Sequence, residues 1–108
     1  MTFQDIAARF ERSGSGSDSF KALSRSAFDL MKDDPDNAGL YFLVGVAAKS
    51  YVRVYEDQAV TEEIAERAKR ILAGYNARIA QALEQDAAAR FAVLSAITLD
   101  YEWQVADF

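Results

Sequence analysis

The chain has 108 residues, no Cys, no His and a formal net charge of −5, a length that suits one domain built on one hydrophobic core. Without thiol or imidazole side chains it cannot form disulfides, zinc or iron–sulfur sites that need those ligands, or a Ser-His or Cys-His pair. Its 12 basic residues are scattered among 17 acidic ones, which is a poor match for the phosphate backbone of nucleic acid. We therefore expect a single helical domain over residues 1–108, with no catalytic residues, no metal and no cofactor.

A short helix is expected at the N-terminus. The composition favours helices throughout, because alanine is abundant and β-branched residues are dispersed. Thr2 suits the N-cap, and Phe3, Ile6 and Phe10 then share one face of the first helix. Residues 13–17 read Ser-Gly-Ser-Gly-Ser, which predicts a flexible loop after it.

Asp18 or Ser17 is expected to cap the second helix, which should end near Asp33. Its apolar residues recur every three or four positions: Phe20, Leu23, Ala27, Leu30 and Met31. This periodicity predicts an amphipathic helix whose inner face joins the core.

The third helix is expected to be the most buried element. Asp34 suits its N-cap, since Pro35 follows at the position where a helix tolerates proline best. Residues 40–48 are apolar on nearly every side, yet they are too few to cross a bilayer. Gly45 costs about 1 kcal/mol relative to Ala in a helix, so we expect it to let another helix cross closely. The helix should end near Asp57.

Thr61 is expected to cap a fourth helix with two glutamates in its first turn. The inner face of that helix is predicted to carry Ile64, Ala68, Ile71, Tyr75, Ile79 and Ala82. Asp86 then suits the cap of a fifth helix, although residues 84–89 could also carry the fourth helix straight through. The sequence leaves that junction open.

The fifth helix is apolar over more of its circumference than one small core requires. One row, spaced alternately by four and three residues, is expected to face the core: Ala87, Phe91, Leu94, Thr98, Tyr101, Val105 and Phe108. A second row, on another flank, has no obvious partner within the chain: Ala92, Ala96, Leu99 and Trp103. Small residues let a second helix approach, and a large aromatic side chain often dominates the energy of an interface. This second row predicts a partner-binding surface, used twice around the two-fold axis of a homodimer.

Aromatic side chains elsewhere fall into two groups. Six phenylalanines are expected in the core: Phe3, Phe10, Phe20, Phe28, Phe42 and Phe91. The tyrosines each carry a hydroxyl that needs water or a partner. They predict an alternative site, a pocket for a small apolar or aromatic ligand lined by Tyr41, Tyr51, Tyr55, Tyr75 and Tyr101.

Carboxylates are the only strong metal ligands that remain. Residues 34–39 match the first half of a calcium loop, but Ala38 and Gly45 stand where oxygen ligands are needed. A magnesium-dependent enzyme built on acidic residues near the start of the fourth helix is a third alternative, ranked last: Asp57, Glu62, Glu63 and Glu66. Glutamates in a first helical turn already suit the helix dipole, so no metal is expected.

Together these patterns predict an all-α fold, an antiparallel or orthogonal bundle of four main helices with a short N-terminal helix. The first residues lack the basic and apolar regions of a secretory signal, so we expect a cytoplasmic protein. The predicted function is a small protein–protein interaction module that self-associates, with neither nucleic acid nor membrane as a partner. The alternative is a bundle that binds a small ligand through its tyrosines.

Overall fold

The computed structural model describes residues 1–105 and 108. These residues form five α-helices, one short 3-10 helix and no strand. The α-helices are α1 (Phe3–Arg12), α2 (Ser17–Asp33), α3 (Ala38–Tyr55), α4 (Glu62–Leu83) and α5 (Ala87–Gln104), and the 3-10 helix η1 (Pro35–Asn37) lies between α2 and α3. The prediction of an all-α bundle with four main helices and a short N-terminal one is confirmed.

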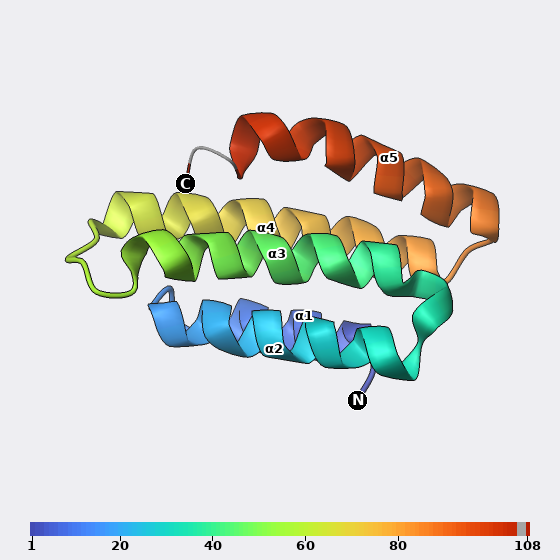
Figure 1. The fold of residues 1–108 in the computed structure, drawn as a ribbon, viewed down its shortest axis with the longest axis horizontal. Coiled ribbons are helices and arrows are strands. Elements are labelled where there is room, and N and C mark those ends of the chain that lie inside the picture. The colour runs from blue at the N-terminus through green and yellow to red at the C-terminus, as the bar shows by residue number, and fades with distance from the viewer. Residues whose placement is uncertain (106–107) are drawn as a thin grey trace.

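The helices pack in three layers. Consecutive helices run in opposite directions, and α3 and α4 form the middle layer (Figure 1). The pair α1 and α2 covers one side of that layer, whereas α5 alone covers the other. Because α5 contacts only α3 and α4 among the described helices, its outer side faces no other helix of the chain.

Three helix starts are capped as the sequence predicts. Thr2 Oγ1 accepts a hydrogen bond from the backbone N–H of Asp5, and the Asp5 carboxylate accepts one from the N–H of Thr2. Thr61 and Asp86 each accept from the backbone N–H three residues further on. Since α4 ends at Leu83 and Asp86 caps α5, the fourth and fifth helices are separate.

The start of α2 differs from the prediction. Gly16 occupies the N-cap position and makes no side-chain hydrogen bond, and Ser17 is already helical. The connection between α1 and α2 is therefore residues 13–16, one residue shorter than expected. Ser19 Oγ donates to the carbonyl oxygen of Gly14 (2.7 Å) and ties this connection to α2. The mobility of the connection stays a prediction.

The start of α3 also differs. Pro35 begins the 3-10 turn η1, and α3 starts only at Ala38. Asp34 makes no capping hydrogen bond. Its carboxylate accepts instead from Asn37 Nδ2 (2.8 Å) and from the Tyr41 hydroxyl (2.6 Å). Because η1 separates Asp34 from the start of α3, Asn37 and not Asp34 occupies the N-cap position of that helix.

The centre of the core lies on α3. Seven of its residues are buried: Leu40, Tyr41, Val44, Gly45, Ala47, Ala48 and Tyr51. A Cβ atom added at Gly45 would lie only 2.5 Å from the Phe28 ring, so the expected close approach of a second helix at this glycine is confirmed. Ser24 Oγ donates to the carbonyl oxygen of Gly45 (3.1 Å) across the same contact.

The residues of α4 that are buried differ in part from those predicted to be buried. Ile64 is 41% exposed and Ile71 is half-buried. Ala65, Leu72 and Asn76 are buried in addition to the predicted Ala68, Tyr75, Ile79 and Ala82. The buried stripe is rotated because α4 is covered on two sides, by α1 as well as by α5.

The predicted core row of α5 is wrong at three positions, since Ala87, Phe91 and Thr98 are exposed. The row that faces α3 and α4 advances in steps of four: Val93, Ile97, Tyr101 and Val105. A row in steps of four winds around a straight α-helix by about 40° per step, whereas the alternating row runs nearly straight along one flank of the buried face. Phe42 on α3 is likewise 49% exposed, so the assignment of Phe42 and Phe91 to the core is wrong.

Candidate interaction site

The outer face of α5 is almost free of charge. The exposed residues of this helix are Ala87, Ala88, Phe91, Ala92, Ser95, Thr98, Leu99, Glu102 and Trp103. Only Glu102 is charged. By contrast, α4 exposes six charged residues: Glu62, Glu63, Glu66, Arg67, Arg70 and Arg78. A surface helix of a monomer normally carries charged and polar residues on its outer side, so the face of α5 is unusual.

Large apolar side chains stand out from this face. Leu99 is 75% exposed and Trp103 is 74% exposed, and a spacing of four residues places them next to each other on the helix. Of the two predicted alanines, Ala92 is exposed and Ala96 is half-buried. Of the four predicted residues, Leu99 and Trp103 are therefore large side chains exposed to solvent, and the small residue Ala96 lies one helical turn before Leu99.

Phe91 belongs to the same face, although the sequence periodicity places it in the core. It is 69% exposed, and it stands at the first position of a row with a spacing of four that continues through Ser95 to Leu99 and Trp103. That spacing is visible in the sequence and could have identified Phe91 as a surface residue. Phe91 also belongs to the row with alternating spacing, however. Because the periodicity assigns that row to the core, it assigns Phe91 to the core with it.

Other exposed apolar side chains lie on the helices that α5 covers. Phe42 and Val54 belong to α3, and Ile64 belongs to α4; each is at least 41% exposed. Neither α1 nor α2 exposes a large apolar side chain. Met1, which precedes α1, is also 66% exposed, and the Phe42 ring lies beside Phe28 of α2. These side chains belong to several elements, whereas the three most exposed of the large apolar side chains share one helix, α5: Phe91, Leu99 and Trp103.

A shallow hollow of about 200 Å³ borders the face where α5 begins. Phe91 and Leu94 line it from α5, and Leu40 lines it from α3. The Leu94 side chain lies close to Gly39, where an added Cβ would be 3.5 Å from it. Asp36, Asn37 and Arg90 also line it, so the hollow beside Phe91 has both apolar and polar walls.

The polar groups at the flanks of α5 are engaged within the chain. The Tyr75 hydroxyl donates to the Asp100 carboxylate (2.8 Å) and so joins α4 to α5. Burial, followed by this hydrogen bond, raises the pKa of Tyr75 well above its usual value. Arg90 Nη1 donates to the carbonyl oxygen of Gln85 (2.9 Å). These contacts orient α5 so that its uncharged side points outward.

The five tyrosines do not meet in one place. Tyr41 and Tyr75 are buried, and each donates its hydroxyl to a different aspartate. Tyr51 and Tyr55 are adjacent, with ring centroids 5.1 Å apart. They line an open hollow of about 470 Å³ between the end of α3, the start of α4 and the α1–α2 connection. The structure thus brings two of the predicted tyrosines together and leaves Tyr41, Tyr75 and Tyr101 elsewhere.

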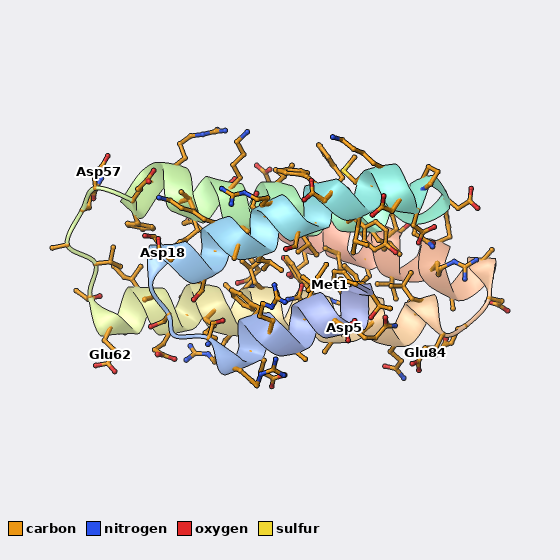
Figure 2. All side chains as sticks on the ribbon, turned by 90° about the horizontal axis from the view of Figure 1, so that it is seen from below. Met1, Asp5, Asp18, Asp57, Glu62 and Glu84 are labelled. Carbon is orange, nitrogen blue, oxygen red and sulfur yellow. The ribbon has the colours of Figure 1, made fainter. Side chains whose placement is uncertain are left out.

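The acidic residues considered for magnesium are spread out. Figure 2 shows Asp57 and Glu62 at one end of the bundle, pointing away from each other. Among residues 1–105 and 108, no group of three or more His, Cys, Asp or Glu side chains is arranged to hold a metal ion. Within the same residues, no helix is both long enough and apolar enough to span a membrane.

Comparison with known proteins gives no match: no family model, curated protein or solved structure is significantly similar to the chain. Function must therefore be argued from the site itself. The outer face of α5 is the feature that departs most from an ordinary protein surface.

Proposed function

We propose that this protein is a small cytoplasmic interaction module that self-associates through the outer face of α5. The observation that carries the proposal is the exposure of Phe91, Leu99 and Trp103 on a helix face whose single charge is Glu102. Contact with a second copy would remove these side chains from water. No catalytic role is proposed.

The geometry favours two copies of α5 packed against each other. Ala92 and Ala96 lie beside the large side chains and leave room for a second helix to approach. In a two-fold arrangement, Leu99 and Trp103 of each copy would pack against the same surface of the other. Because the face is nearly uncharged, little electrostatic repulsion between like charges resists the association of two copies.

The oligomeric state and its response to mutation test this proposal. Sedimentation equilibrium should show a concentration-dependent dimer for the unmodified protein. Full burial of side chains such as Leu and Trp contributes about 1.5 to 3 kcal/mol each, so the double variant Leu99→Ser, Trp103→Ala should weaken dimerisation at least about 100-fold. Helicity and cooperative melting should persist, since both side chains are about three-quarters exposed in the single chain.

Two further variants sharpen the test. Ala92→Trp adds apolar surface but blocks close approach, so it should also shift the protein toward monomer. Ile64→Ser removes an exposed apolar side chain from α4 and should leave the dimer intact. A wild-type protein that is monomeric at high micromolar concentration would overturn the proposal, as would an Ile64→Ser variant that dissociates as readily as the α5 double variant.

Ligand binding is a second candidate function, and its candidate site is the hollow beside Tyr51 and Tyr55. Tyr51 and Tyr55 line it together with apolar Val60 and Ala65, a mixture of apolar and polar groups that suits a small aromatic molecule. Native mass spectrometry separates the two functions. A monomer that retains a stoichiometric small molecule supports the ligand-binding bundle, whereas a dimer without ligand supports the interaction module.

A further inference from the structure

A second unusual surface lies on the opposite flank of α3, where α2 runs beside it (Figure 1). A shallow, open hollow of about 240 Å³ lies between the two helices. Its lining residues are Lys21, Ser24, Arg25 and Phe28 from α2 with Lys49 and Val52 from α3. Three of these six residues are cations and none is acidic. In a chain with a net charge of −5, this is a local reversal of charge.

The floor of the hollow is apolar and well defined. Because Gly45 has no side chain, the Phe28 ring lies directly against α3. The ring is also within 6.5 Å of the ring of half-exposed Phe42, centroid to centroid. Ser24 Oγ holds α2 to the carbonyl oxygen of Gly45. The floor is thus a fixed aromatic surface, positioned by the packing of α2 on α3.

Two of the three cations at the rim have no ion pair within the described part of the chain. Lys21 forms an ion pair with Glu56 and is already neutralised. Arg25 and Lys49 are exposed, and neither forms an ion pair among the described residues. Arg25 and Lys49 are therefore the cations that a partner's carboxylates can reach.

The two cationic rows continue along the helices beyond the hollow. Lys32 lies four residues after Phe28 on α2, and Arg53 lies four residues after Lys49 on α3. At a spacing of four, each pair shares one side of its helix. Acidic residues also lie near these rows: Asp29 is four residues after Arg25, and Glu56 is three residues after Arg53. Neither lines the hollow, so the excess of positive charge is confined to the hollow itself, where Arg25 and Lys49 flank Phe28 and Val52.

We propose that this α2–α3 surface binds an acidic amphipathic segment of a partner protein. An apolar side chain of the segment would pack on Phe28 and Val52, and its carboxylates would pair with Arg25 and Lys49. Such a segment complements both the charge and the apolar floor of the surface. The proposal does not depend on self-association through α5, because it uses other helices and other residues.

A protein segment fits this surface better than nucleic acid does. Binding to a phosphate backbone needs many cations that follow the strand, whereas here one of the three lining cations is already paired with Glu56. The acidic remainder of the chain would also repel a long polyanion. A short segment with two or three carboxylates meets the available cations without extending over the acidic regions.

The probe is a short synthetic helical peptide that carries Leu and Phe on one face, glutamates on both flanks of that face and a fluorescent label. Fluorescence anisotropy should show saturable binding with a Kd of about 10 to 500 μM, and the affinity should fall between about 50 mM and about 300 mM salt. The double variant Arg25→Gln, Lys49→Gln should raise the Kd at least about fivefold, since each exposed charge pair contributes modestly. The matched control is Arg67→Gln, Arg78→Gln, which makes the same change in net charge on exposed positions of α4 and should leave the Kd unchanged.

Comparison probes decide what the surface recognises. The same peptide with glutamine in place of glutamate should bind at least about fivefold more weakly, and amide shifts in a ¹⁵N spectrum should cluster on α2 and α3. Equal binding of the glutamine peptide, equal weakening by the α4 control, or the absence of saturable binding would each overturn the proposal. Tighter binding of a single-stranded oligonucleotide that carries the same charge as the peptide would overturn it in favour of a phosphate-binding surface. Sedimentation of the Arg25→Gln, Lys49→Gln variant should match that of the wild type, which keeps this test separate from that of α5.

Discussion

Replacing Gly45 by alanine tests the close packing of α2 on α3, the contact at the centre of the fold. An added Cβ atom would lie 2.5 Å from Cε1 of the Phe28 ring and 2.8 Å from both Cδ1 and Cζ. The clash involves one whole edge of the ring, so a small rotation of the ring does not relieve it. Either the Phe28 side chain must leave its position or the two helices must separate.

Two effects of opposite sign determine the free energy of unfolding of Gly45→Ala. Alanine is favoured over glycine inside a helix by about 1 kcal/mol. Overpacking a filled contact costs about 1 to 3 kcal/mol. The hydrogen bond from Ser24 to the carbonyl oxygen of Gly45 resists separation of the helices (3.1 Å), so we expect the cost to exceed the gain. The predicted net effect is a destabilisation of up to about 2 kcal/mol.

Urea unfolding followed by far-UV circular dichroism measures this effect, provided that the dependence on denaturant is unchanged. Gly74→Ala is the matched control, because Gly74 also lies inside a helix but has no atom within 4 Å of its added Cβ. It should stabilise the protein by up to about 1 kcal/mol. In a Phe28→Ala background, Gly45→Ala should be stabilising too, which gives a coupling energy of about 2 kcal/mol in a double-mutant cycle.

The reasoning fails if Gly45→Ala stabilises the wild type as much as Gly74→Ala does. In that case the two helices would not be in close contact in solution. A destabilisation that persists unchanged in the Phe28→Ala background would refute the specific role of the Phe28 ring.

Three other predictions follow from buried polar groups and from the core. Asn76 is 2% exposed, and neither its Nδ2 nor its Oδ1 has a hydrogen-bond partner among residues 1–105 and 108. Asn76→Leu should therefore raise the free energy of unfolding by about 1 to 3 kcal/mol in urea titrations, and a decrease would contradict this. Burial and hydrogen bonds to aspartates raise the pKa of Tyr41 and of Tyr75. Above about pH 10 the folded state therefore keeps protons that the unfolded state releases. The free energy of unfolding should then fall by up to about 1.4 kcal/mol per pH unit for each residue. A Tyr41→Phe, Tyr75→Phe variant should show a shallower dependence in alkaline unfolding curves, since burial also raises the pKa of Tyr51, which the variant keeps; an unchanged slope would refute the assignment. Val44→Asp should abolish cooperative melting, since Val44 is 0% exposed. An unpaired charge there costs more than the few kcal/mol of free energy that stabilise the domain. A soluble variant with wild-type helicity and melting would contradict the placement of the core.

Features that depend on neighbouring residues could be predicted from the sequence. Thr2, Thr61 and Asp86 cap their helices as expected, because a cap involves a side chain and a backbone N–H only three residues apart. The close approach at Gly45 could also be predicted, since an apolar helix has few other reasons to contain glycine. The surplus apolar surface of the last helix follows from its composition alone, because a helix with so few charged residues has more apolar surface than one small core can cover.

Features that depend on distant residues required the tertiary structure. Asp34 does not cap α3, because the 3-10 turn η1 separates it from the start of that helix, and its carboxylate instead accepts from the Tyr41 hydroxyl seven residues away. On α5, sequence periodicity indicates two apolar rows but assigns Phe91 to the wrong side. The reason is that α5 is apolar around most of its circumference, so its buried side is decided by where α3 and α4 lie and not by its own residues. The basic and aromatic surface between α2 and α3 has the same origin: it combines residues from positions 21 to 52 of the chain, which become neighbours only when the two helices pack.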